Sequence, residues 1–161
     1  MKNPLVLVVD DNKITTKLMH RYLDAHNFEV FEAFDGIECL EKLKERKPNL
    51  VVLDVMMPRM DGYETVKQMR EDEQLKDIPV VIVTALNDVQ TQIKAIEMGA
   101  DDFLSKPVEE KLLIAKAKVL TELSTLRNKV TFLQSLFPKL KEEPNLILNV
   151  DKILAESQIF D

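Results

Sequence analysis

Residues 49–62 read NLVVLDVMMPRMDG, and this stretch decides the fold that we expect for the chain. Its apolar run, residues 50–53, is short and rich in β-branched side chains, which is typical of a strand buried on both faces of a parallel sheet. Asp54 ends the run. Because a carboxylate is costly inside a sheet, we expect Asp54 at the C-terminal end of the strand, in the crevice where open α/β sheets bind ligands. The alternative is that Asp54 only caps the next helix.

Further strand patterns recur along the chain and alternate with helical periodicity. Some are apolar runs like this one, and a shorter segment at 28–31 alternates apolar and polar residues. Strands are predicted over 5–9, 28–31, 80–83 and 102–104, and helices over 14–23, 35–46, 63–71, 88–98 and from 108 onward. Asp11 or Asn12 can cap the first helix, and Asp35 with Glu38 resembles a capping box. This alternation predicts an α/β fold with a parallel sheet covered by helices on both faces. Right-handed crossovers favour the flavodoxin-like strand order 2-1-3-4-5.

Composition limits the classes of protein that the chain can belong to. With 161 residues, it is long enough for one domain of about 100–150 residues and an appendage. Its single cysteine, Cys39, excludes a disulfide framework and suits a reducing compartment. The apolar run at the N-terminus is too short for a signal peptide or a membrane span, so we expect a cytoplasmic protein. The net charge of -6 falls on the first 107 residues, and this acidic body shows no basic patch for nucleic acid.

Five polar residues are predicted to meet at one edge of the sheet. The strand order puts Asp10, Asp11 and Asp54 side by side, and Thr84 and Lys106 end the fourth and fifth strands. Three converging carboxylates need a cation or a proton, and oxygen ligands without nearby His or Cys favour Mg²⁺. Asp54 could then be a nucleophile that forms an aspartyl phosphate, with Lys106 neutralising the phosphoryl oxygens and Thr84 donating to one of them. Taken singly, these residues could instead be a helix-capping pair, a strand threonine and a solvated lysine.

These motifs resemble the receiver domain of two-component response regulators over about residues 3–125. The resemblance rests on Asp10-Asp11, Asp54 with the MMPRMDG that ends at Gly62, Thr84-Ala85 and Lys106-Pro107. It implies that Asp54 accepts a phosphoryl group from a histidine kinase or a phosphotransfer protein. It also implies a Mg²⁺ site made by Asp10, Asp11, Asp54 and the backbone carbonyl of Met56, and a cis peptide bond between Lys106 and Pro107. Such a protein is a switch and not an enzyme with a separate substrate.

The resemblance further assigns a signalling path. Thr84 would couple to the aromatic residue of the fifth strand, which is Phe103 here, and the signal would leave through the fourth helix, fifth strand and fifth helix. The kinase would dock on the first helix near residues 14–18. Met56 and Leu86 hold the two positions that tune hydrolysis in the family. Because neither side chain can orient a water molecule, we predict slow self-dephosphorylation.

Two other classes fit the sequence less well. A haloacid-dehalogenase-type phosphatase also uses an aspartyl phosphate and Mg²⁺, but it needs Asp-x-Asp after its first strand, whereas Asp10 and Asp11 are adjacent. A flavodoxin-like FMN carrier needs a phosphate loop rich in Ser, Thr and Gly. The residues 10–15, DDNKIT, are acidic and would repel the FMN phosphate.

The last helix carries an apolar heptad pattern. Steps of four and three residues connect Val119, Leu123, Leu126, Val130, Leu133 and Phe137, after a polar exception at Lys116. A helix over 108–137 would be about 45 Å long. We therefore expect a receiver domain over 1–125 and an extension over 126–161, with a short helix at 149–160. The seam favours a homodimer through a parallel two-stranded coiled coil. The alternative is an amphipathic helix folded back onto its own domain.

Overall fold

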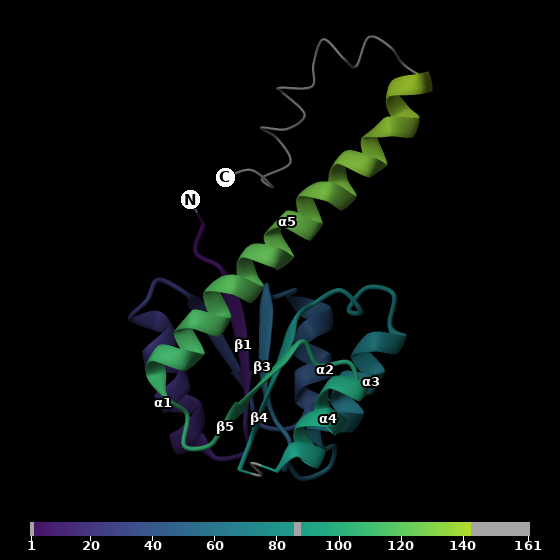
Figure 1. The fold of residues 1–161 in the computed structure, drawn as a ribbon. Coiled ribbons are helices and arrows are strands. Elements are labelled where there is room, and N and C mark those ends of the chain that lie inside the picture. Colours follow the sequence, from purple (N-terminus) through teal and green to yellow (C-terminus); the bar gives the residue numbers. More distant parts are fainter. Residues whose placement is uncertain (1, 86–87, 143–161) are drawn as a thin grey trace.

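The computed structural model describes residues 2–85 and 88–142, which form a five-stranded parallel sheet with helices on both faces (Figure 1). The strand order is β2-β1-β3-β4-β5, which confirms the predicted flavodoxin-like order. The elements in chain order are β1 (Leu5–Val9), α1 (Lys13–Asp24), β2 (Glu29–Ala33), α2 (Gly36–Glu45), β3 (Leu50–Asp54), α3 (Gly62–Glu71), β4 (Val80–Thr84), α4 (Val89–Glu97), β5 (Asp102–Ser105) and α5 (Glu110–Glu142).

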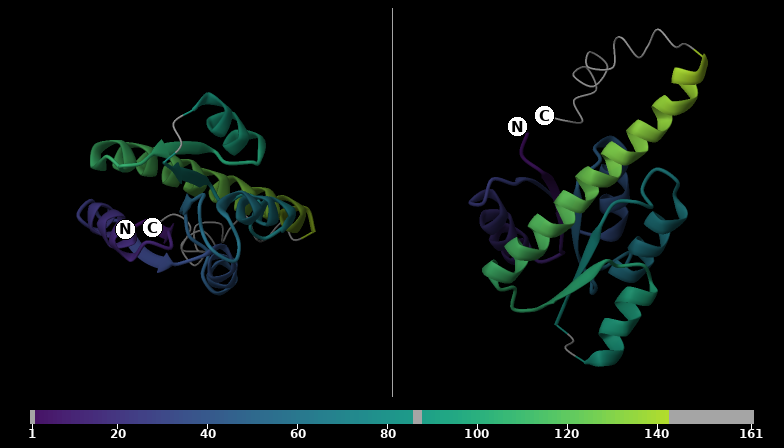
Figure 2. Two further views of the ribbon diagram at one scale, coloured as in Figure 1. Left: turned by 90° about the horizontal axis from the view of Figure 1, so that it is seen from below. Right: turned by 45° about the horizontal axis from the view of Figure 1, so that its top comes forward.

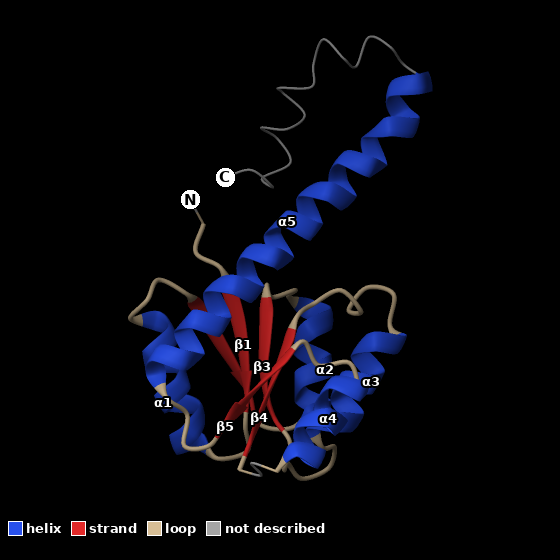
Figure 3. Cartoon of the chain, in the orientation of Figure 1, coloured by secondary structure: helices blue, strands red, loops and turns tan. Residues whose placement is uncertain are grey.

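Each face of the sheet has its own hydrophobic core (Figure 3). Helices α2, α3 and α4 cover one face, where Leu43 and Met69 pack against alternate strand residues such as Leu7. Helices α1 and α5 cover the other face, where Leu23 and Leu113 pack among the remaining strand residues. Because successive strand side chains point to opposite faces, both faces must be apolar. This explains the continuous apolar runs that predicted the strands.

Helix starts follow the predicted caps. Asn12 caps α1, and its side chain accepts hydrogen bonds from the backbone of Ile14 and Thr15. Asp35 caps α2 by accepting from the backbone N–H of Glu38 at 2.9 Å. The α4 helix stops before Gly99, whose φ of 101° lies in the left-handed region that glycine adopts freely.

Helices α1 and α2 each bury one stripe of side chains and leave other apolar residues outside it. In α1, the sheet is contacted by Met19 and Leu23, while Ile14 and Leu18 are exposed on the opposite side of the helix. In α2 the most buried side chains are Cys39 and Leu43, whereas Ile37 and Leu40 are only partly buried. Which side of a helix is buried depends on how the helix crosses the sheet. Sequence periodicity shows that the helix has an apolar side, but it does not fix the rotation of the helix about its own axis.

The last helix is longer than predicted. It runs 33 residues from Glu110 to Glu142 and passes Pro138, so the predicted end at residue 137 is wrong. Proline removes one backbone hydrogen bond and crowds the preceding turn, and here that disturbance falls only one turn from the helix end. Figure 2 shows that α5 starts against the sheet and extends well beyond it. Among the described residues, no helix combines the length and apolar character that a membrane span requires.

Some predictions concern residues that the structure does not describe. The short helix expected at 149–160 and the residue Leu86 lie outside the described residues, as does the side chain of Phe137.

Candidate functional site

Three carboxylates converge where β1 and β3 end. Asp10 directly follows β1, and Asp54 is the last residue of the neighbouring strand β3. One carboxylate oxygen from each of Asp10, Asp11 and Asp54 lies within 4.8 Å of the other two. Asp10 and Asp54 are buried, whereas Asp11 is exposed and opens the cluster to solvent. The structure thus brings the three predicted acidic residues together.

The ammonium group of Lys106 lies between the two buried carboxylates. Its Nζ is 2.8 Å from Oδ2 of Asp10 and 3.1 Å from Oδ1 of Asp54. Partial burial favours the neutral amine, but hydrogen bonds and charge attraction from Asp10 and Asp54 outweigh it and raise the pKa of Lys106. The lysine therefore stays protonated and offsets part of the negative charge of the cluster.

The electrostatics around Asp54 favour an added cation. Burial and the nearby charge of Asp10 raise the pKa of Asp54, while Lys106 and the backbone N–H of Val55 act in the opposite direction. The net effect is a raised pKa with burial as its largest cause. The cluster itself sets three carboxylates against one ammonium group. Carboxylate oxygens are hard ligands of the kind that Mg²⁺ prefers. By donor chemistry and spacing, the three acids fit a divalent cation.

Strands β4 and β5 bring two more predicted residues to this edge. Thr84 is buried at the end of β4, one position beyond Val83, the register partner of Asp54. The backbone carbonyl of Thr84 accepts a hydrogen bond from the backbone N–H of Lys106 at 2.8 Å. The peptide bond between Lys106 and Pro107 is cis. A backbone hydrogen bond therefore fixes the positions of Thr84 and Lys106 relative to each other.

An ion pair between Arg59 and Asp35 holds the loop after β3, and no sequence pattern predicted it. Arg59, with φ of 65°, donates from Nε to Oδ2 of Asp35 at 2.9 Å. The backbone carbonyl of Met60 accepts from the N–H of Gly36 at 3.3 Å. These contacts attach the loop that carries Met56 to the N-terminus of α2. Burial raises the pKa of Asp35, but hydrogen bonds from the Glu38 N–H and Arg59 outweigh burial and lower it.

Gly62 allows α3 to begin directly beside Asp54. Its N–H donates to the carbonyl of Val55 at 2.9 Å. A Cβ at this position would lie 2.3 Å from the carbonyl oxygen of Asp54, so no larger residue fits without a backbone shift. The Asp-Gly pairs at 35–36 and 61–62 are the sequence signal for both close approaches, because a Cβ at either glycine would meet a neighbouring carbonyl oxygen.

A second unpredicted contact joins β5 to α5. Lys116 lies with Nζ 2.5 Å from Oδ2 of Asp102 and 5.8 Å from the centre of the Phe103 ring. Phe103 itself is partly buried against the core. The polar exception in the heptad pattern is therefore held on its own domain.

Several helices expose apolar side chains in the part of the chain that the structure describes. On α4 and α5, Val89, Ile93, Ile96 and Leu112 are exposed. On α1, Ile14 is 80% exposed and Leu18 lies one turn further on. Single exposed apolar residues are normal, but neighbouring ones mark candidate contact surfaces.

Comparison with known proteins places this geometry in a family. Residues 6–118 match the model of the response regulator receiver domain. The chain is 39% identical over 116 residues to the response regulator PleD of Caulobacter vibrioides, covering 72% of this chain and 26% of that protein. It is 40% identical over 131 residues to the hybrid signal transduction histidine kinase D of Dictyostelium discoideum, covering 81% of this chain and 8% of that protein. The chain therefore spans only a small part of these relatives.

Solved structures agree with the sequence comparison. The receiver domain of the Francisella response regulator 1452 superposes with a TM-score of 0.72 at 32% identity, covering 76% of this chain and 99% of that one. The chemotaxis response regulator CheY4 of Vibrio cholerae gives a TM-score of 0.70 at 29% identity, covering 73% and 98%. The chain belongs to the response regulator receiver family of two-component signalling.

Proposed function

We propose that this protein is a phosphorylation-activated switch in which Asp54 accepts a phosphoryl group from a phosphohistidine. The observation that carries the proposal is the position of Asp54, buried among two further carboxylates and 3.1 Å from the ammonium group of Lys106. A nucleophilic carboxylate next to a fixed cation is the arrangement that phosphoryl transfer to aspartate requires. Membership of the receiver family supports the same chemistry.

In the proposed step, an oxygen of Asp54 forms a bond to phosphorus while the phosphorus–nitrogen bond of the donor histidine breaks. The electron pair of that bond leaves with the imidazole nitrogen. Lys106 then pairs with a phosphoryl oxygen, and the Thr84 hydroxyl donates to another. Asp10, Asp11, Asp54 and the backbone carbonyl of Met56 are the groups that would hold Mg²⁺. When bound, Mg²⁺ supplies positive charge that offsets the phosphoryl oxygens.

The proposed donor is a histidine kinase or phosphotransfer protein that docks on α1. Ile14 and Leu18 support this docking site, because both are exposed on the first helix after Asp10 and Asp11. We propose no enzymatic turnover of a separate substrate and no direct contact with nucleic acid. The buried free thiol of Cys39 supports a reducing cytoplasmic location.

The proposed output leaves through the face formed by α4, β5 and α5. Thr84 and Phe103 are the switch residues, and the exposed residues Val89, Ile93 and Ile96 supply contact area. The proposed division is a receiver domain over 1–125 and an extension over 126–161, and the proposed homodimer forms through the C-terminal helix that joins them. Met56, 71% exposed beside Asp54, has no group that positions a water molecule, which supports slow self-dephosphorylation.

The test is mass spectrometry of the intact chain after incubation with acetyl phosphate, with and without Mg²⁺. We expect a single phosphoryl adduct that needs Mg²⁺ and is absent from Asp54→Ala. The matched control is Asp77→Asn, an exposed acid in the loop after α3, which should form the adduct as the natural chain does. An adduct that persists in Asp54→Ala, or none in the natural chain, would overturn the proposal.

A further inference from the structure

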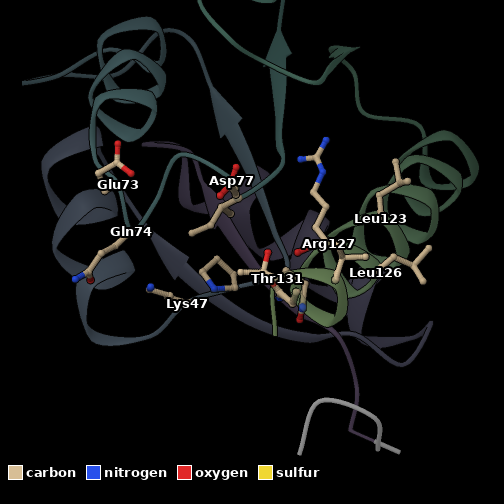
Figure 4. Close-up of a pocket in the computed structure, with 14 residues that line it drawn as sticks. Lys47, Glu73, Gln74, Asp77, Leu123, Leu126, Arg127 and Thr131 are labelled. Carbon is tan, nitrogen blue, oxygen red and sulfur yellow. The ribbon is translucent and has the colours of Figure 1, made fainter. Parts of the chain in front are cut away.

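A groove of about 640 Å³ lies between α5 and the loops at residues 47–49 and 73–78. These loops lead into β3 and β4, so the groove lies at the edge of the sheet opposite to Asp54. Figure 4 shows its two walls, with Leu123, Leu126 and Arg127 on one side and Glu73, Gln74 and Asp77 on the other. The groove is therefore separate from the acidic site at the ends of the strands.

The lining of this α5 groove is largely apolar. Leu123, Leu126 and Val130 line it from α5 and are between 44% and 52% exposed. Pro48 and Ile78 line it from the domain. Covering apolar side chains in a concave surface removes them from water and is favourable. The α5 groove therefore favours an occupant with an apolar side.

Charged side chains of both signs stand along the same groove. Lys47 and Arg127 are exposed cations, and Glu73 and Asp77 are exposed anions. A ligand with a strong charge of one sign, such as a nucleic acid, would be repelled by one of these pairs. A peptide segment with an apolar side and flanking charges of both signs fits this lining better.

Residues 143–161 of the same chain have this chemistry. They follow α5 directly and lie outside the described residues. In the helix that the sequence predicts over 149–160, one side carries Val150, Ile153 and Leu154. The charged residues outside this stripe are Asp151, Lys152 and Glu156. Low hydrophobicity is typical of segments that stay solvated, and this segment does not have it.

We propose that residues 149–160 form a helix antiparallel to α5 and pack its apolar side into the α5 groove. The contact goes beyond the proposed function, because it needs neither the chemistry of Asp54 nor a partner protein. The docked helix covers Leu123, Leu126 and Val130, which belong to the heptad pattern of the proposed homodimer. The segment and a second copy therefore compete for the same side of α5, and docking opposes pairing.

The segment is long enough to reach the groove. Residue 135 lies about 10 Å back along α5 from its end at Glu142. Since packed helix axes are about 10 Å apart, the linker 143–148 must span about 15 Å, and fully extended it reaches about 20 Å. A helix over 149–160 that starts there is about 18 Å long and ends level with Leu123. Pro144, two residues after the end of α5, favours the change of direction.

The first test is thiol labelling of the full chain, without acetyl phosphate, in two matched variants on α5. Val130 lies in the groove and Val119 outside it, and they are 52% and 57% exposed in the described structure. We expect Val130→Cys to react about tenfold more slowly than Val119→Cys, at any protein concentration. The buried Cys39 should not contribute. Adding Leu154→Glu should abolish the difference, whereas Ala155→Glu, on the other side of the predicted helix, should preserve it.

The second test is hydrogen exchange at the backbone amides of residues 149–160. Exchange should be slow in the natural chain, fast in Val130→Glu and unchanged in the control Val119→Glu. Equal labelling of the two cysteines, or exchange at the rate of an unfolded peptide, would overturn the proposal. So would slow labelling at both positions that strengthens with protein concentration, because a second copy would then cover α5. Mass spectrometry of the Asp54 adduct reports on the proposed function separately.

Discussion

The ammonium group of Lys106 lies 2.8 Å from the fully buried carboxylate of Asp10, although 96 residues separate the two in sequence. The same nitrogen lies 3.1 Å from Asp54. One lysine therefore pairs with two buried carboxylates, and the stability of this edge depends on it.

Lys106→Met should lower the free energy of unfolding by about 1–3 kcal/mol without Mg²⁺, because two buried carboxylates lose their charged hydrogen-bond donor. Mg²⁺ should then raise the melting temperature of the variant more than that of the natural chain, since added positive charge replaces the missing ammonium. Thermal unfolding with and without Mg²⁺ measures both effects. Lys76→Met, which breaks only an exposed pair with Glu73, should leave the melting temperature essentially unchanged. Equal Mg²⁺ increments in the natural and Lys106→Met chains would contradict the prediction.

Gly62→Ala should destabilise the protein by about 1–3 kcal/mol, because its Cβ would lie 2.3 Å from the Asp54 carbonyl oxygen and force a backbone shift. The shift moves Asp54, so adduct formation with acetyl phosphate should slow as well. Urea unfolding and timed mass spectrometry check the two effects. Glu64→Ala, two residues on in the same helix, should leave the rate of adduct formation unchanged. A Gly62→Ala chain with natural stability would show that this close approach is unimportant.

The Asp35–Arg59 pair should make stability depend on pH. Hydrogen bonds from the Glu38 N–H and Arg59 outweigh burial and hold the pKa of Asp35 below its usual value. A lowered folded-state pKa adds stability above the unfolded-state pKa of about 3.9, and this stability is lost as the pH falls through the folded-state value. Asp35→Asn, which keeps a capping side chain, should cost about 1 kcal/mol at neutral pH and progressively less below about pH 4. Denaturation of both chains across this range tests the sign, and a pH-independent difference would contradict it.

Cys39 should be unreactive in the folded protein. Burial raises the pKa of its thiol to about 12, and the charges of Asp35 and Glu38 act in the same direction. Because the thiolate is the reactive form, labelling by a thiol reagent at pH 8 should proceed only as fast as the protein unfolds. The labelling rate should therefore rise steeply in urea. Rapid labelling under native conditions would show that α2 opens locally.

Met56→Asn should shorten the lifetime of the phosphorylated protein, if Asp54 is phosphorylated as proposed. The amide can orient a water molecule next to Asp54, whereas the thioether cannot, and the backbone carbonyl stays in place. We expect hydrolysis to accelerate about tenfold, which corresponds to about 1.4 kcal/mol in the barrier. Loss of the adduct, followed by mass spectrometry after removal of acetyl phosphate, gives the rate. Met57→Asn is the control, and an equal acceleration there would contradict a positional effect.

Much of this architecture could be predicted from local patterns. Continuous apolar runs predicted β1, β3 and β4, and shorter patterns predicted β2 and β5. The alternation of these strands with helical periodicity predicted the parallel sheet, and the flavodoxin-like order chosen for it is the one observed. Asp54 stood out because a carboxylate directly after such a run must lie at a strand end. In a parallel sheet all those ends share one edge, so the meeting of Asp10, Asp11 and Asp54 also followed from the predicted strand order.

Other features depend on how separate elements pack. The Arg59–Asp35 and Lys116–Asp102 pairs join residues 24 and 14 positions apart on different elements, and no local pattern links such partners. The rotation of α1, which exposes Ile14, is set by its crossing of the sheet. The α5 heptad was readable from spacing alone, but the groove between α5 and the loops at residues 47–49 and 73–78 was not. Periodicity shows that a helix has an apolar face, whereas the direction of that face depends on long-range packing.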